Sequence, residues 1–202
     1  MLAEITMCKE QLINAAKRAY QIGLQTGNGG NLSCRVPETD TILIKASGVS
    51  FGECTLDNIV TVDLQGRVSG QAGKPSRELV THLCIYNRRS DIQAIFHCHS
   101  PWSIACADDS LEIPLMTGHA MAKLGPIPVI VEDAQASRDF TVEVENLLNE
   151  NPALKAFVQK GHGIFSLGTN IIQAEHNAEL VEETAQIAFL IDLKKTPGSG
   201  KA

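Results

Sequence analysis

The chain has 202 residues, 44% of them hydrophobic, which is enough to bury one core without disulfides or a structural metal. Its formal net charge is −6, and the lysines and arginines are scattered along the chain, which argues against a nucleic-acid partner. No apolar run reaches the length of a membrane span, and no charged-then-apolar leader opens the chain. We therefore expect a cytoplasmic protein with a single domain over residues 1–195 and no membrane association.

The first quarter of the chain predicts one helix followed by a hairpin-rich sheet. From residue 4 to about residue 24, apolar residues recur at intervals of three and four, which is typical of a helix with one buried face. Several glycines between residues 23 and 30 end it. Short strands are expected at 32–36, 41–45 and 59–62, with a turn at Gln65-Gly66 leading into a strand near Val68.

The remainder alternates helices and strands. Pro75-Ser76 opens a helix that runs to about residue 87, with Ser76 as N-cap and Glu78 in the first turn. The later elements are a strand at 92–97, a short helix from Pro101, a strand at 127–131, a helix at 137–149, strands at 156–159 and 164–167, and a closing helix at 170–193. The tail at 196–202, rich in Gly, Ser and Lys, is predicted to be disordered.

Six cysteines are present, but none forms a Cys-x-x-Cys unit and several lie within apolar runs. Disulfide frameworks and cysteine zinc sites both require closely spaced pairs. The cysteines are therefore interpreted as buried free thiols.

Three histidines form a candidate metal site. His97 and His99 lie two residues apart at the end of a predicted strand, and the period of two places both imidazoles on one face. His162 lies between two glycines, where the backbone can turn tightly. Three neutral imidazoles are a common catalytic zinc set, although histidines at such spacing are also often only solvated or hydrogen-bonded.

Glu78 and His82 are four residues apart on one predicted helix face, so they form a second possible ligand pair. For His82 we favour a structural role, as a partly buried histidine bonded to a nearby carbonyl. For Glu78 the simple alternative is a carboxylate that stabilises the start of its helix.

Glycines, hydroxyls and side-chain amides suggest a phosphate cradle. They occur in Gly27-Asn28-Gly29-Gly30-Asn31, in Ser47-Gly48 and at Ser76. Each segment alone could be an ordinary turn, and none matches the P-loop or dinucleotide fingerprint.

Five motifs in order resemble the class II aldolase/adducin family: Gly-Gly-Asn-Leu-Ser (29–33), Ala-Ser-Gly (46–48), Lys-Pro-Ser-Arg-Glu (74–78), His-Cys-His-Ser (97–100) and Gly-His-Gly (161–163). The resemblance implies a three-layer α/β/α fold around a mostly antiparallel sheet. It also implies a cyclic homotetramer with active sites at subunit interfaces. The implied metal ligands are His97, His99, His162 and Glu78, with Glu78 also acting as acid/base. The implied phosphate ligands are Asn31, Ser47, Gly48 and Ser76, and we predict that the neighbouring Asn28 and Arg77 also contact the phosphate.

The activity that this resemblance implies is cleavage of a ketose 1-phosphate, such as L-fuculose 1-phosphate, to dihydroxyacetone phosphate and an aldehyde. A Zn²⁺ ion, or Mn²⁺ or Co²⁺ in its place, would stabilise an enediolate. Dehydration of methylthioribulose 1-phosphate and decarboxylation of a phosphorylated keto acid remain alternatives on the same fold. A non-catalytic adducin-like binding module is an alternative of another class.

Three positions depart from the family's patterns. Sugar-phosphate 4-epimerases of the family carry aspartate where this chain has Glu78, which argues against that reaction. The family's aldolases carry a tyrosine donor in the region where this chain has Gly118 and His119. Arg77 replaces a small serine, and it either adds a cation for a carboxylate or a phosphate oxygen or simply faces solvent.

Overall fold

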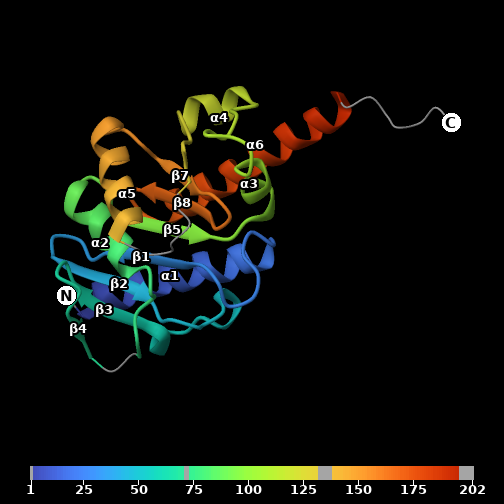
Figure 1. Cartoon of the computed structure of the whole chain (residues 1–202). Coiled ribbons are helices and arrows are strands. Elements are labelled where there is room, and N and C mark those ends of the chain that lie inside the picture. The colour runs from blue at the N-terminus through green and yellow to red at the C-terminus, as the bar shows by residue number, and fades with distance from the viewer. Residues whose placement is uncertain (1, 71–72, 132–137, 196–202) are drawn as a thin grey trace.

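The computed structural model describes residues 2–70, 73–131 and 138–195. Its centre is an eight-stranded sheet in the order β4-β3-β2-β1-β5-β8-β7-β6 (Figure 1). Neighbouring strands are antiparallel except for the parallel pair β6 and β7. The strands are β1 (Asn31–Arg35), β2 (Thr41–Lys45), β3 (Ile59–Asp63), β4 (Val68–Ser69), β5 (Ala94–Cys98), β6 (Val129–Ile130), β7 (Ala156–Gln159) and β8 (Gly163–Gly168).

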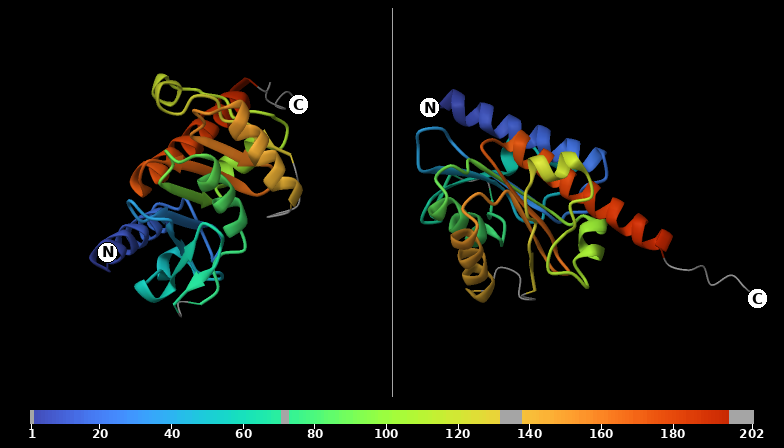
Figure 2. Two further views of the ribbon diagram at one scale, coloured as in Figure 1. Left: turned by 90° about the vertical axis from the view of Figure 1, so that its left-hand side faces the viewer. Right: turned by 90° about the horizontal axis from the view of Figure 1, so that it is seen from above.

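Helices cover both faces of the sheet. Figure 2 shows α1 and α6 side by side on one face, while α2 and α5 pack together on the other. The predicted three-layer α/β/α fold with a mostly antiparallel sheet is therefore confirmed. The helices are α1 (Leu2–Gln21), α2 (Leu79–Arg88), α3 (Pro101–Cys106), α4 (Gly118–Lys123), α5 (Arg138–Glu150) and α6 (Ile171–Lys195), with short 3-10 turns η1 (Phe51–Glu53) and η2 (Leu56–Asn58).

Alternation along β5 divides the core in two and orients the histidines. Phe96 and Cys98 belong to the hydrophobic cluster beneath α1 and α6, whereas Ile95 belongs to the cluster beneath α2 and α5. Successive side chains of a strand point to opposite faces. His97 therefore shares the face of Ile95, and its ring stacks on Phe165 with the centroids 4.1 Å apart.

The start of α2 differs from the prediction. The helix begins at Leu79, and its N-cap residue is Glu78 instead of Ser76. The segment before it forms a turn in which the N–H of Leu79 bonds to the Ser76 carbonyl, at 3.1 Å, so the chain is not yet helical at Ser76. Glu78 makes no side-chain capping bond, which excludes the simple capping role and leaves its carboxylate free for other contacts.

Other predicted elements agree with the structure apart from their ends. The strand expected at 127–131 is shortened to β6, while α4 and the two 3-10 turns were not predicted. The predicted disordered tail, and residue 137 at the start of the expected helix, lie outside the described residues. All six cysteines are free thiols, as predicted, but Cys106 is only partly buried, whereas the other five are buried as expected. In the part of the chain that the structure describes, no helix is long and apolar enough to cross a membrane.

A buried polar cluster joins α2 to β1. Ser33 Oγ lies 2.7 Å from His82 Nδ1 and 2.7 Å from the Tyr86 hydroxyl. His82 is completely buried, and that burial lowers its pKa to about 3. The structural role of His82 is thereby supported, although its partner is a hydroxyl and not the expected carbonyl.

The burial of His82 predicts a pH-dependent stability. Its pKa is 6.5 in the unfolded chain and about 3 in the fold, so the unfolded state binds the extra proton between these values. The free energy of unfolding should therefore fall as the pH is lowered from about 6.5 toward 3. In the variant His82→Asn, the slope below pH 6 should be smaller by roughly 1.4 kcal/mol per pH unit. Urea unfolding of the metal-free wild type and variant between pH 7 and pH 4.5 measures how the free energy of unfolding depends on pH. Equal slopes in the two proteins would contradict the low pKa of His82.

Candidate metal centre and substrate pocket

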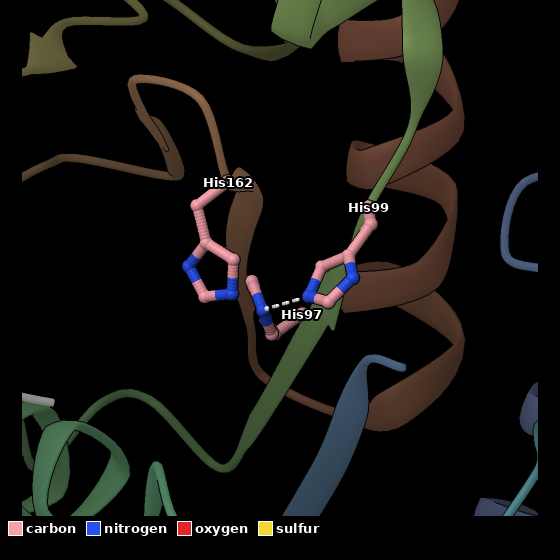
Figure 3. A group of neighbouring side chains, drawn as sticks. All are labelled: His97, His99 and His162. Carbon is pink, nitrogen blue, oxygen red and sulfur yellow. Dashed lines mark hydrogen bonds between the residues drawn. The ribbon is translucent and has the colours of Figure 1, made fainter. Parts of the chain in front are cut away.

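The three predicted histidines converge on one point (Figure 3). His97 lies near the end of β5, His99 just beyond it, and His162 in the turn between β7 and β8. The Nε2 atoms of His97 and His99 are 3.1 Å apart, and one ring nitrogen from each of the three histidines lies within 4.8 Å of the others. Segments more than 60 residues apart in the sequence thus meet to form one cluster.

Hydrogen bonds orient two of the rings. His97 Nδ1 lies 2.8 Å from the backbone carbonyl of Ile164, and His162 Nδ1 lies 2.6 Å from Gln159 Oε1. Because these oxygens only accept, each Nδ1 carries the proton and each Nε2 presents a lone pair. Partners of this kind commonly fix the tautomer of metal-binding histidines.

The carboxylate of Glu78 faces those lone pairs. Its Oε2 is 3.2 Å from His97 Nε2, and its Oε1 is 3.2 Å from His162 Nε2. Burial lowers the pKa of His97 and that of His162 to about 3, so both rings are uncharged at neutral pH. Lone pairs opposite a carboxylate repel each other, whereas a cation between them would attract both. The donor set of three imidazoles and one carboxylate therefore fits a divalent ion such as Zn²⁺.

Close backbone approaches make this geometry possible. A Cβ at Gly163 would lie 2.2 Å from the carbonyl oxygen of Cys98, so only glycine lets the His162 turn approach the end of β5. A Cβ at Gly29 would lie 2.6 Å from His99 Nδ1. The glycine-rich segment therefore makes room for a histidine ring, a role that its sequence did not reveal.

Two glutamines near the cluster were not predicted. Gln159 holds His162, as described above, and Gln25 Oε1 accepts the backbone N–H of His99 at 2.7 Å. Gln25 is almost completely buried. Neither belongs to a recognisable motif. Gln25 is brought to His99 by the packing of distant segments, whereas Gln159 lies only three residues before His162.

A small pocket adjoins the cluster. Its volume of about 160 Å³ is below the roughly 300–1,000 Å³ of pockets for drug-sized ligands, which indicates a small substrate. All six residues that were predicted to contact a phosphate line this pocket, together with Gly29, Gly30, Lys45, Glu78, His99 and His162. Asn31 also reaches the metal side, since its Nδ2 donates a hydrogen bond to Glu78 Oε2.

Lys45 is a pocket residue that the sequence interpretation missed. Its Nζ donates to the carbonyl oxygens of Ala46, at 3.1 Å, and Val49, at 2.5 Å. Burial lowers its pKa to about 8. A lysine directly before the Ala-Ser-Gly motif is the signal that would have identified it, since a buried amine beside hydroxyls and glycine N–H groups suits an anion.

His119 lies outside this pocket. It lines a separate open groove of about 620 Å³ between α4 and α6, together with Lys123 and His176. Within one copy of the chain, the structure does not bring His119 to the histidine cluster.

The fold is that of a known protein family. The family model described as Class II Aldolase and Adducin N-terminal domain matches residues 10–189. This match covers most of the chain, so the chain belongs to the class II aldolase/adducin family, as its motifs predicted.

Relatives within the family differ in their reactions. The 3-oxo-tetronate 4-phosphate decarboxylase of Haemophilus influenzae is 29% identical over 192 residues, which cover 93% of this chain and 89% of the relative. An L-ribulose-5-phosphate 4-epimerase of Salmonella paratyphi C is 31% identical over 191 residues, which cover 90% of this chain and 84% of the relative. The solved structure of an L-fuculose 1-phosphate aldolase is 27% identical with a TM-score of 0.85, and the match covers 95% of this chain and 89% of the aldolase. Family membership alone therefore does not select one reaction.

The contact at Gly29 predicts a specific defect in metal binding. The variant Gly29→Ala should displace the ring of His99 and weaken binding of Zn²⁺ by at least about tenfold, the lower end of losses seen when groups supporting metal ligands are changed. Calorimetric titration of metal-free protein with zinc measures this loss. A Cβ at Gly118 meets nothing within 4 Å, so Gly118→Ala is the matched control. Equal zinc affinities of the two variants would show that His99 does not hold the ion.

Proposed function

We propose that this protein is a divalent-metal-dependent carbon–carbon lyase that cleaves a ketose 1-phosphate to dihydroxyacetone phosphate and an aldehyde. The observation that carries the proposal is the arrangement of Glu78, whose two carboxylate oxygens each face an imidazole lone pair at 3.2 Å beside the pocket. The ion would be held by His97, His99, His162 and Glu78. When bound, such an ion polarises the ketone of the substrate as a Lewis acid, which contributes several kcal/mol.

The pocket residues divide the remaining tasks. Ser47, Gly48 and Ser76 would bind the phosphate through hydroxyl and backbone N–H groups, with Asn28 and Asn31 beside them. The bond that breaks joins the carbon next to the ketone to the carbon that becomes the aldehyde. Its electron pair stays on the dihydroxyacetone phosphate half, as an enediolate. The hydroxyl that becomes the aldehyde gives up its proton, and Glu78, released from the ion, would take up that proton and pass it to the enediolate carbon.

Decarboxylation of a phosphorylated keto acid is the second candidate. It is favoured by the 29% identity to the 3-oxo-tetronate 4-phosphate decarboxylase. Loss of CO₂ from the carbon next to the ketone leaves the same kind of enediolate, so Glu78 would protonate it in the same way. The two reactions differ in the fragment that leaves.

Three further features belong to the proposal. We infer that zinc is the resident ion, because three imidazoles and one carboxylate are its usual donors. We also infer a cytoplasmic homotetramer that acts on small phosphorylated sugars without nucleic acid or membrane partners. A non-catalytic adducin-like module would need no ion, so metal analysis of the purified protein distinguishes it from the enzyme.

The reaction is tested by condensation. Zinc-loaded protein incubated with dihydroxyacetone phosphate and a panel of aldehydes should form ketose 1-phosphates, detected by phosphorus NMR, and a chelator should abolish the product. Full activity after the zinc has been removed would contradict the mechanism. If no aldehyde condenses while a phosphorylated 3-keto acid releases CO₂, the decarboxylase is the correct member of the pair.

The role of Glu78 is tested by proton exchange. In D₂O, the wild-type enzyme should exchange one hydroxymethylene hydrogen of dihydroxyacetone phosphate. The variant Glu78→Gln should exchange it at least about 100-fold more slowly, as expected for loss of a general acid/base. Proton NMR follows the exchange, and bound zinc is measured in the same samples. A zinc-loaded variant that exchanges at the wild-type rate would exclude Glu78 as the proton carrier.

A further inference from the structure

Two cations line the pocket among the described residues, Lys45 and Arg77, and their surroundings differ. Lys45 is almost completely buried, and two backbone carbonyls hold its ammonium group. Arg77 is exposed. No ion pair or hydrogen bond of its guanidinium is found within residues 2–70, 73–131 and 138–195. An arginine that lines a pocket without a protein partner is available to bind a ligand.

The two cations reach the pocket from different segments of the chain. A β-bridge between Ala46 and Pro75 brings Ser47 and Gly48 beside Ser76, and Lys45 directly precedes this bridge. Lys45 thus belongs to the end with the hydroxyl and backbone N–H groups. Arg77 lies between Ser76 and Glu78, so it directly precedes the residue whose carboxylate faces the imidazoles.

The charges of the pocket leave Arg77 without a counter-ion when only a phosphate is bound. Glu78 offsets one of the two charges of a divalent ion. The second charge of the ion and the charge of Lys45 together match a phosphate dianion. The charge of Arg77 remains, so an additional anionic group on the substrate would complete the balance.

We propose that Arg77 binds a substrate carboxylate, and that the substrates are phosphorylated hydroxy ketones with a carboxylate at the end opposite the phosphate. This inference rests on the proposed function and narrows its substrate class. A guanidinium offers two parallel N–H donors in the geometry of a carboxylate. The carboxylate stays on the aldehyde product in an aldol cleavage and leaves as CO₂ in a decarboxylation, with the electron pair on the phosphorylated fragment in both cases.

A matched pair of unreactive ligands tests this assignment by binding alone. 4-Phospho-D-erythronate and D-erythritol 4-phosphate differ only in a carboxylate or a hydroxymethyl group at one end. Calorimetry on the zinc-loaded wild-type protein should show an approximately tenfold preference for the acid, the size expected for one charge-assisted contact. In Arg77→Gln the preference should fall to within about twofold, while the affinity for the alcohol stays within about twofold of wild type.

Two further variants sharpen the test. Arg77→Lys keeps the charge but loses the paired donors, so it should show an intermediate preference. Arg88→Gln, at the other end of α2, removes an exposed arginine that pairs with Glu145 at 2.9 Å. It controls for the change in net charge and should bind both ligands as the wild type does.

Three outcomes would overturn the assignment. If Arg77→Gln weakens both ligands by the same factor, Arg77 binds the phosphate instead. If it changes neither affinity, the side chain only faces solvent. If the wild-type protein binds neither ligand, the carboxylate site is rejected. All three outcomes leave the proposed function intact, because the condensation assay tests it separately.

Discussion

The site depends on the close approach of two backbones, the end of β5 and the turn between β7 and β8. The antiparallel ladder pairs His97 with Phe165 and Cys98 with Ile164, and no side chain at position 163 could fit against the Cys98 carbonyl. This approach holds the Ile164 carbonyl 2.8 Å from His97 Nδ1 and places His162 over the same point. His97, near the end of β5, is therefore oriented by the carbonyl of Ile164 in β8, and the turn that precedes β8 places His162 beside it.

The electrostatics of the cluster follow from its burial. Removing imidazoles from water disfavours their charged form, and at His97 and His162 this effect lowers the pKa to about 3. At neutral pH these rings therefore present lone pairs to a carboxylate at 3.2 Å. A proton is a poor counter-charge for such a cluster, because binding it would require a charged imidazole in a buried site. A divalent ion gains four donors at once and is the better fit.

The same arrangement is compatible with several reactions. Relatives named as a decarboxylase, an epimerase and an aldolase share this fold, and the three reactions are carried out on different phosphorylated sugars. A fold therefore supplies a common site, while the side chains around it decide which bond changes. In this chain both Glu78 and Arg77 line the pocket.

The sequence by itself predicted most of the helices and strands and most of the candidate site residues, but not α4 or the start of α2. Periodicity is a local property, so strands such as β2 and β7 were predicted to the residue. The spacing of two placed His97 and His99 on one face, and the ordered motifs identified the family.

Only the tertiary structure decided which distant groups meet. The contact of Gln25 with His99, and the place of Lys45 in the same pocket as His99 and His162, depend on packing between segments far apart in the chain, which no local pattern encodes. The start of α2 was also decided there, because the turn at Ser76 delays the helix and turns Glu78 toward the imidazoles. Residue types and spacing thus identified the three histidines as candidate ligands. Their orientation, and the position of the Glu78 carboxylate between them, depend on contacts across the sheet.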